Sequence, residues 1–577
     1  MRIPLERLSI IDKIIGLIER QRPSDRLILR ILFFTVIGSS IYLFLSINNS
    51  YITSTPTSGG TLVEGIVGIP RFVNPTLAIT RADQDTVALV YSGLMKIDEN
   101  GSLQPDLAEN ISLAEDNRTY SITLKQDRNF HDGNPITAAD VAYTIELIKN
   151  PDLKSPLRGN WNDVVVEEVS PYELNITLTE PYTPFIENFT IGIIPKHIWS
   201  TLPIEQLPFS QYNTKPVGSG PFAVDTVHRD NSGLINGYTL KPAKNTGAYS
   251  NLSTIELVFF QNKNELAIAL LNNEITSTAS LPAEKIFELN QKEIQIVKQP
   301  LPRIFGIFFN QNRSPALRDE SVRKALNTAI DRDRLVAEAL GGYGVPTTKP
   351  ILNDYRTIEL DDTEESNNST STQTGAKDIL IAGGWEQNDA GLWEKEIDES
   401  VETLSLTIRT NNTPLFDTTT AIIAEDWREL GVEVQVEQYE QTGLVQSVIR
   451  TRDFQALLFG LDINRMQDLY PFWHSSQKDD PGLNISQYTN VSVDKLLEEA
   501  RTTEDGVERQ KLLIEISDII TEEIPAIFLF APSINYVVDK DIKITPMNTL
   551  GKPSDRFMNI AKWHAKTETV WPIFQNN

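Results

Sequence analysis

The hydrophobic pattern near the start of the chain stands out from the rest. Residues Leu27 to Ile47 (LILRILFFTVIGSSIYLFLSI) are interrupted by charge only at Arg30, and as a helix they would extend about 32 Å. That length matches the hydrocarbon core of a bilayer, and Arg30 lies near enough to one end to reach the headgroups. The pattern therefore predicts one transmembrane helix at 27–47.

The charges that flank this segment predict its orientation. The first thirty residues carry seven basic and four acidic side chains, an excess of three positive charges. Because positive charge stays on the cytoplasmic side, we expect residues 1–26 in the cytoplasm and everything after Ser50 outside. A cleaved signal peptide is the alternative, but it would have a shorter apolar region and a small-residue cleavage site, which SINNSYITS lacks. We therefore expect an uncleaved, single-pass anchor in the cell membrane.

Two polar runs predict segments outside any folded core. Residues 48–59 (NNSYITSTPTSG) are rich in Asn, Ser and Thr, a composition typical of a flexible tether. Residues 361–374 (DDTEESNNSTSTQT) contain no apolar side chain, so burial cannot offset the entropy lost on ordering them. We expect the first run to join the anchor to an outer domain and the second to be a disordered surface insertion.

Elsewhere, strand-like and helix-like patterns alternate. Residues 119–126 (TYSITLKQ) place apolar side chains at every second position, as in a half-buried strand. Thr137 and Asp140 in TAADVAYTIELI have the spacing of a helix capping box. Two alternating segments flank a helical one between 404 and 439, which predicts a β-α-β unit. Further helices are expected around 321–341, with Asp331 as a cap, and at 491–501 and 507–523. IPAIFLF (524–530) is predicted to be a buried strand. The fold class expected is α/β.

His131 and Asp132 lie between the predicted strand and helix, in NFHDGNPITAAD. The following Gly133 suits a turn with a positive backbone angle, so we interpret the pair as part of a structural turn. The chain contains no H-E-x-x-H, G-x-S-x-G or phosphate-loop motif. A pair of catalytic carboxylates has no sequence signature, but nothing else indicates an enzyme.

Composition narrows the function further. A length of 577 residues exceeds what one hydrophobic core needs, so several domains are expected. The formal net charge of −26 argues against a nucleic-acid partner. The absence of cysteine excludes disulfides, zinc–thiolate sites, thiol nucleophiles and a lipid-modified N-terminal cysteine. No metal or cofactor is expected.

Several blocks together resemble one family. They are YSGLMKIDENGSLQPDLAENISLAEDNRTYSITLKQDRNFHDGNPITAADVAYTIE, PVGSGPF, LRDESVRKALNTAIDRDRLV, MQDLYPFWHSSQ, LNISQYTNVSVDKLLEEAR and EIPAIFLF. Their succession is similar to that of the extracytoplasmic solute-binding proteins of peptide ABC importers, the oligopeptide- and dipeptide-binding type of family 5. The resemblance extends from about Thr61 to Phe530.

This resemblance implies a two-lobed, periplasmic-binding-protein-like α/β clamp with a third, accessory domain. Its hinge would lie at Arg303–Asn310 and Ile524–Ala531. The segments are expected to divide into lobe I (60–100, 193–300 and 531–577), an accessory domain II (101–192) and lobe III (301–530).

The resemblance also implies a function and partners. The clamp would capture oligopeptides by hinge closure and deliver them to an ABC permease with separate ATPase subunits, as a monomer. Relatives carry nickel complexes, haem or oligosaccharides on a similar clamp, so a non-peptide cargo is the alternative. A third possible function is that of a membrane-anchored adhesin or structural protein, which would need no closing cleft.

The resemblance suggests candidate ligand contacts. In the family, an aspartate in a W-x-x-D stretch of the second lobe meets the peptide ammonium. Here Phe459-Gly460-Leu461-Asp462 occupies that place, with Asp468 six residues later, so either aspartate is a candidate and Asp462 is preferred. Arg303 and Arg465 are candidates for the peptide carboxylate. The remaining candidates near the cleft are Asn74, Tyr91, Gly93, Gly306, Asn310, Trp473 and His474, whereas Trp385, Trp393 and Trp427 are expected in the core.

Overall fold

The computed structural model describes residues 22–51, 53–244, 246–247, 249–289, 294–352, 369–548 and 550–570. The chain forms two compact units. The first consists of Met1–Ser58 with Lys566–Asn577, and the second of Gly59–Ala565.

The first unit contains the predicted membrane segment. Helix α2 (Pro23–Tyr51) includes a stretch, Pro23–Ser46, with a mean hydropathy of 2.1, long and apolar enough to cross a membrane. None of this stretch is buried against protein; Phe34, for example, is 69% exposed. Such a row of exposed apolar side chains is unfavourable in water. The helix therefore agrees with the predicted apolar segment at 27–47.

The predicted tether is not a flexible coil throughout. Helix α2 extends to Tyr51, and strand β1 (Thr53–Thr57) pairs antiparallel with β23 (Lys566–Val570), with Thr55 opposite Glu568. Threonine favours extended backbone, and the partner strand comes from the other end of the chain. Composition alone could not indicate that pairing, so the prediction of flexibility is wrong for this strand.

The predicted insertion at 361–374 is only partly described. Residues 361–368 lie outside the described residues, whereas helix α12 (Ser369–Ala382) contains the rest. Gln373 is buried, and its side-chain amide donates to the carbonyl of Asp426 over 3.0 Å. The prediction of disorder is therefore wrong for 369–374, because the apolar residues that follow draw this polar stretch into a packed helix.

In the second unit, one sheet passes through both lobes. Its strands, in spatial order, are β20 (Glu433–Tyr439), β19 (Ser405–Asn411), β21 (Ala456–Asp462), β14 (Arg303–Phe309), β22 (Ala526–Asp539), β12 (Ser277–Thr278), β2 (Thr61–Val67), β11 (Thr254–Phe260), β10 (Ile235–Pro242) and β9 (Phe222–Arg229), with β13 (Ile294–Pro300) and β15 (Gly344–Pro346) also paired to β22.

Strand β22 links the two lobes. Its first part pairs with β14 in lobe III, and its second part pairs with β13 and β12 in lobe I. The predicted strand 524–530 is thus found, but it begins at Ala526 and continues to Asp539. The chain crosses between lobes at two adjacent points, where the Leu301 N–H donates to the Pro532 carbonyl over 2.9 Å. Bending at these crossings stays a prediction.

Lobe III has a core on each face of its sheet. Ile307 and Phe309 of β14 pack on one face, and Ile304 and Phe308 on the other, the two-residue period of a strand. The predicted β-α-β unit is confirmed, since β19 and β20 are parallel and helix α13 (Pro414–Leu430) joins them. Trp385, Trp393 and Trp427 are buried in the first core, as expected.

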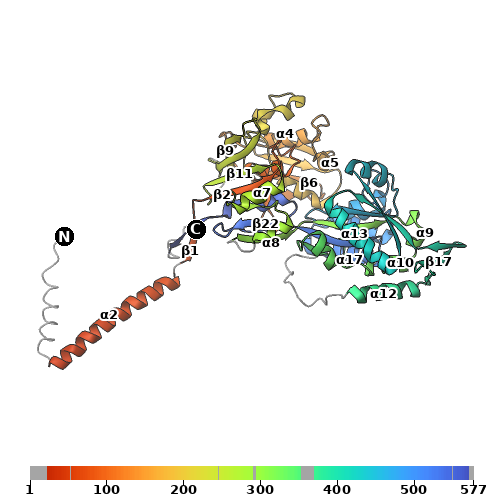
Figure 1. Ribbon diagram of the computed structural model, residues 1–577. Coiled ribbons are helices and arrows are strands. Elements are labelled where there is room, and N and C mark those ends of the chain that lie inside the picture. The colour runs from red at the N-terminus through yellow and green to blue at the C-terminus, as the bar shows by residue number, and fades with distance from the viewer. Residues whose placement is uncertain are drawn as a thin grey trace. The chain divides into compact units, whose positions relative to one another are not determined.

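The helices of lobe III cover both faces of its sheet. Figure 1 shows α10 (Glu320–Thr328), α13 and α17 (Gly506–Glu523) around its strands. Asp331 caps α11 by accepting from the Arg334 N–H over 2.9 Å, as predicted. The helices are α9 (Pro315–Arg318), α10 (Glu320–Thr328), α11 (Arg332–Ala339), α12, α13 (Pro414–Leu430), α14 (Gln441–Gly443), α15 (Tyr470–Trp473), α16 (Val491–Thr502) and α17 (Gly506–Glu523); a small sheet comprises β16 (Glu386–Gln387), β17 (Trp393–Ile397) and β18 (Ser400–Thr403).

Lobe I and the accessory domain have cores of their own. The accessory core packs Tyr120, Val141 and Phe185 between an antiparallel sheet and α4. Its elements are β5 (Ala108–Leu113), β6 (Thr119–Leu124), β8 (Glu173–Thr177), β7 (Val165–Ser170), α4 (Ala138–Lys149), α5 (Arg158–Trp161) and the short helix η1 (Thr183–Thr190). Lobe I adds β3 (Met95–Ile97), α3 (Arg81–Val90), α6 (Lys196–Trp199), α7 (Lys263–Leu271) and α8 (Ala283–Leu289) to its part of the large sheet, and β3 pairs with β4 (Leu103–Pro105) of the accessory domain.

The turn around His131 is structural, as predicted. Strand β6 and helix α4 are found where the sequence indicates them, and the Thr137 N–H donates to the Asp140 carboxylate over 2.9 Å. Gly133 has a φ of 90°. The His131 ring accepts from the Gly218 N–H at 3.2 Å and donates to the Gly220 carbonyl at 3.1 Å. Burial lowers the pKa of His131, so a neutral ring clamps the PVGSGPF loop.

Candidate ligand-binding site

Asp462 and Arg303 form an exposed ion pair. Asp462 ends β21 and Arg303 begins β14, and the antiparallel register places them directly opposite each other. Nη2 of Arg303 lies 3.0 Å from Oδ2 of Asp462, and the two side chains are 49% and 57% exposed. Because water screens such a pair, either group can exchange its partner for a charged ligand group at little cost.

The distance between these groups limits their joint role. A fully extended peptide spans about 3.3 Å per residue, so the two charged termini of an oligopeptide cannot both lie at a single ion pair. One extended ligand therefore cannot place its ammonium on Asp462 and its carboxylate on Arg303. Their individual roles stay predictions.

Asp468 is placed very differently. Its side chain is only 5% exposed, and its Oδ2 accepts from Nη2 of Arg501 at 2.8 Å and from the Tyr182 hydroxyl at 2.9 Å. Oδ1 accepts from the Tyr470 N–H at 3.2 Å. Burial, together with the Asp468 charge, raises the pKa of Tyr182, so the phenol remains protonated and donates. An incoming ammonium would have to displace these partners, and the geometry favours Asp462 as its counter-ion.

Arg465 lies on the loop between these two aspartates. Its guanidinium contacts the Asp555 carboxylate, and its Nε lies 3.8 Å from Oε1 of Glu187. The Arg465 side chain is 8% exposed. A peptide carboxylate would therefore meet an arginine that already has buried acidic neighbours, which weighs against its predicted role.

Trp473 and His474 belong to the interior of lobe III. Trp473 is buried among Phe308, Tyr488 and Phe528. His474 stacks on Tyr470 at 4.1 Å between ring centroids. Their predicted contact with a ligand stays untested, and their burial gives them a packing role.

The candidates in the first lobe and near the hinge are also buried. Asn74 accepts from the Thr76 N–H at 2.9 Å, and Asn310 donates to the Arg452 carbonyl at 2.8 Å. Tyr91 is buried, which raises the pKa of its phenol. A Cβ on Gly93 would lie 2.7 Å from the backbone of Thr190, and one on Gly306 would lie 2.8 Å from the Ile527 carbonyl oxygen. The two glycines thus permit close approach of neighbouring backbone, and the other three residues are buried within the fold. Their predicted contact with a ligand stays a prediction.

Sequence reasoning missed Tyr182, Glu187 and Arg501, which contact the predicted residues. Tyr182 and Asp468 are 286 positions apart, and no local pattern relates them. The missing signal is a long-range one, since each residue looks like an ordinary surface residue in its own segment.

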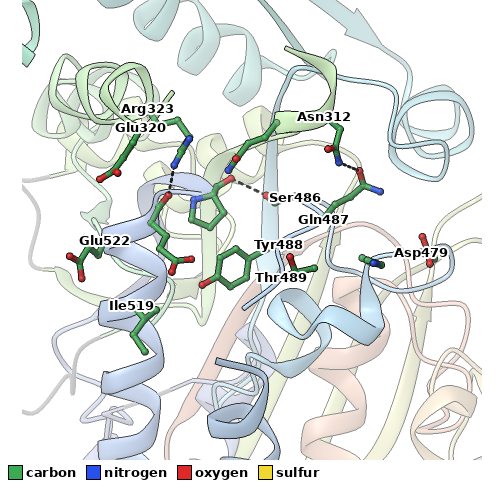
Figure 2. A pocket seen from close by; sticks show the side chains of 14 residues that line it. Asn312, Glu320, Arg323, Asp479, Ser486, Gln487, Tyr488, Thr489, Ile519 and Glu522 are labelled. Atoms are coloured by element: carbon green, nitrogen blue, oxygen red, sulfur yellow. Dashed lines mark hydrogen bonds between the residues drawn. The ribbon is translucent and has the colours of Figure 1, made fainter. Parts of the chain in front are cut away.

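A separate cavity of about 1030 Å³ lies in lobe III, at the other end of β14 from Arg303. In Figure 2, Glu320 and Arg323 stand on one side and Asn312 and Gln487 on the other. Nη2 of Arg323 donates to the Glu523 carbonyl at 3.1 Å, and the Ser486 hydroxyl donates to the Pro525 carbonyl at 3.0 Å. The length of β14, roughly 20 Å, separates the cavity from the Arg303–Asp462 pair.

Among the residues that the structure describes, no group of three or more His, Asp or Glu is placed to hold a metal ion.

Comparison with known proteins agrees with this architecture. Oligopeptide-binding protein AppA of Bacillus subtilis is 27% identical over 525 residues, which cover 88% of this chain and 92% of AppA. The structure of AppA in complex with a nonapeptide has a TM-score of 0.63 and 26% identity, covering 88% of this chain and 99% of that one. NikZ from Campylobacter jejuni, in complex with Ni(L-His), has a TM-score of 0.64 and 25% identity, covering 87% and 99%.

The likeness to these structures confirms the two-lobed periplasmic-binding-protein fold. Residues 102–482 match the bacterial extracellular solute-binding proteins, family 5 middle. Because that match includes well over half of the chain, the protein belongs to family 5 of the bacterial extracellular solute-binding proteins.

Proposed function

We propose that this protein is a membrane-anchored receptor that captures oligopeptides by hinge closure and delivers them to an ABC importer. The observation that carries the proposal is the likeness to AppA, which extends over 88% of this chain and includes a structure with a bound nonapeptide. The permease and its ATPase are separate partners, because this sequence has no phosphate-loop motif. The receptor acts as a monomer and is not an enzyme.

Peptide recognition on such a clamp relies on the ligand backbone. An extended peptide adds as a strand, while roomy pockets accept varied side chains. The charged N-terminus then supplies polarity, since charge-assisted hydrogen bonds are the strong ones. In our proposal Asp462 receives the ammonium, and Arg303 is the resident cation that the ammonium displaces.

The proposed anchor is helix α2. Its apolar stretch and the positive excess before it support a cytoplasmic N-terminus with the second unit outside the cell. The intact mass of protein extracted from membranes should include the first residues of the chain. A mature species that begins near Asn48 would show instead that the segment is a cleaved signal.

The proposed domain division keeps lobe I at 60–100, 193–300 and 531–577, the accessory domain at 101–192 and lobe III at 301–530. The hydrophobic cores support this division with small adjustments. Leu94, Met95 and Ile193 pack in the accessory core rather than in that of lobe I.

The decisive experiment identifies the cargo. Full-length protein purified from its own cells in detergent is analysed by native mass spectrometry, and the released ligands are sequenced. Peptides should be recovered, and a synthetic nonapeptide should bind in calorimetric titration. Recovery of a nickel complex, haem or an oligosaccharide, with no peptide bound, would replace this proposal by the alternative cargo that the likeness to NikZ keeps in view.

A further inference from the structure

The accessory domain contacts lobe III through two polar side chains of one short helix region. Tyr182 immediately precedes η1, and Glu187 lies within it. Phe185 and Phe189 of the same helix are buried in the accessory core, where both rings pack against Tyr120. The helix is therefore fixed to its own domain while it presents Tyr182 and Glu187 to another.

The first contact joins Tyr182 to lobe III. Its hydroxyl donates to Asp468, which also pairs with Arg501. The Arg501 guanidinium lies between two aromatic rings, 4.8 Å from the Tyr182 centroid and 3.9 Å from that of Tyr470. Burial by itself would lower the pKa of Arg501. The hydrogen bond and the charge of Asp468 outweigh burial, so the pKa of Arg501 lies above its usual value. The cation is thus held between the accessory domain and lobe III.

The second contact joins three parts of the molecule. Arg465 of lobe III approaches Glu187 of the accessory domain and pairs with Asp555 of lobe I. Asp555 is itself fixed, because its Oδ2 accepts from the N–H groups of Gly551 and Lys552 at 2.9 and 3.1 Å. A movement of lobe III away from the other two parts would break both contacts.

The chemistry of these contacts suits an interface that opens and closes. The accessory core and the lobe III cores are separate hydrophobic clusters. Polar interfaces between domains are the kind that permit relative motion. In the joined state Asp468 and Arg501 pair with each other, which offsets part of the cost of burying these two charges.

We infer that Tyr182, Glu187, Arg465, Asp468 and Arg501 form a clasp by which the accessory domain holds lobe III, that this joined arrangement is the closed clamp, and that the clasp so sets how tightly a ligand is retained. This inference rests on the proposed hinge closure. The clasp residues act on closure and are positioning residues, since Asp462, not Asp468, meets the ligand in our proposal. The apparent affinity for a ligand falls in proportion to the fraction of closed protein, so weakening the clasp weakens binding at a distance.

The test uses Tyr182→Phe in the full-length protein, because it removes one hydroxyl and leaves the ring on Arg501. Spin labels at Glu180→Cys and Glu504→Cys report the distance between the accessory domain and lobe III, in a chain that has no cysteine of its own. The matched control is Tyr172→Phe, since Tyr172 packs against the accessory core. We expect Tyr182→Phe, but not the control, to shift the ligand-free distance distribution toward longer values.

Binding supplies the second readout. With a synthetic nonapeptide as the probe, Tyr182→Phe should raise the dissociation rate about tenfold, whether the peptide N-terminus is free or acetylated. Asp468→Asn should do the same, and the two changes together should cost less than their sum. If Asp468→Asn does not fold, Tyr182→Phe decides alone.

The outcomes separate the clasp from the cargo. If the wild-type protein binds no peptide, the proposed cargo fails, but the ligand-free distances still test the clasp. Unchanged distances in Tyr182→Phe, at unchanged thermal stability, overturn the clasp even if peptides bind. Longer distances with unchanged dissociation of a bound peptide overturn its role in ligand retention.

Discussion

Nη2 of Arg303 and Oδ2 of Asp462 lie 3.0 Å apart at the paired ends of β14 and β21, with both side chains about half exposed. The pair keeps a carboxylate in place at the junction of the lobes while leaving it open to water and to exchange. A peptide ammonium that takes the place of the guanidinium gains a charge-assisted hydrogen bond as the closing cleft removes water.

Replacing Asp462 by Asn should therefore weaken binding of a free-amine peptide by roughly 10- to 100-fold, since hydrogen bonds to charged groups contribute about 1.5–3 kcal/mol. Acetylating the peptide N-terminus removes the ammonium that Asp462 is expected to meet. It should weaken binding to the wild type strongly and to Asp462→Asn only slightly. Calorimetric titration of both proteins with both peptides measures this coupling.

Asp468→Asn is the matched comparison, because it changes the other candidate carboxylate by the same single group. If the clasp is correct, this variant weakens free and acetylated peptides equally. A loss seen only with the free-amine peptide would identify Asp468 as the ammonium site. Equal binding of both peptides to the wild type would argue against recognition of the amine.

Local physics in the sequence predicted most of the elements. The capping box of Thr137 and Asp140, the Asp331 cap and the β-α-β unit all depend on residues a few positions apart, and the structure contains each. Asp462 and Asp468 show where such reasoning ends. Asp462 ends β21 and Asp468 follows six residues later, yet the first is exposed beside Arg303 and the second is buried beside Tyr182.

That difference depends on partners far away in the chain. Arg303 precedes Asp462 by 159 positions, and Tyr182 precedes Asp468 by 286. The strand within the predicted tether has the same origin, since Thr55 meets Glu568 across almost the whole sequence. A family resemblance supplied the lobes, but it did not supply these contacts.

Arg556 offers a test of the lobe I core, because it is a buried cation shared by two buried carboxylates. Its Nη2 lies 2.7 Å from both Glu64 and Asp85, with all three side chains at most 2% exposed. Burial lowers the pKa of Arg556, but Asp85 and Glu64 raise it above its usual range. Arg556→Met should destabilise the protein by roughly 3–5 kcal/mol, since it leaves two acids without their shared partner. Chemical denaturation measures the loss.

Lys562→Met is the control for that experiment. Lys562 pairs with Glu99 at an exposed site, where both side chains are at least 40% accessible, so the denaturation midpoint should not move. A similar effect of the two substitutions would contradict a special role for burial at Arg556.

The ribbon of β1 and β23 predicts a specific cross-link. Thr55 and Glu568 are opposite each other, at a separation that a disulfide can bridge in paired strands. The variant Thr55→Cys/Glu568→Cys should therefore form a disulfide on mild oxidation, visible as a mobility shift that reduction reverses. Thr55→Cys/Lys566→Cys, which is out of register, should react much less. Equal reaction of both pairs would mean that the segment behaves as a flexible tether.

The clasp also predicts a pH dependence, because Glu187 is a buried carboxyl. Burial, with the nearby Asp555 charge, raises its pKa from 4.5 to about 7, although Arg465 and Arg509 act in the opposite direction. In an open clamp water would restore the ordinary value, so the closed form binds more protons between these two pH values. Protonation of Glu187 therefore favours closure below about pH 4.5, and this contribution is lost as the pH rises through 7.

Peptide binding should accordingly weaken by about tenfold or more between pH 5 and pH 8, since one pKa unit corresponds to a factor of ten. Glu187→Gln keeps a neutral group of the same shape in the clasp. Its affinity should stay nearly constant over this range and match that of the wild type at pH 5. Titrations with an N-acetylated peptide remove the ligand amine from the comparison. A wild-type pH profile that Glu187→Gln leaves unchanged would assign the dependence to another group, such as a histidine, and would contradict the titration of Glu187 on closure.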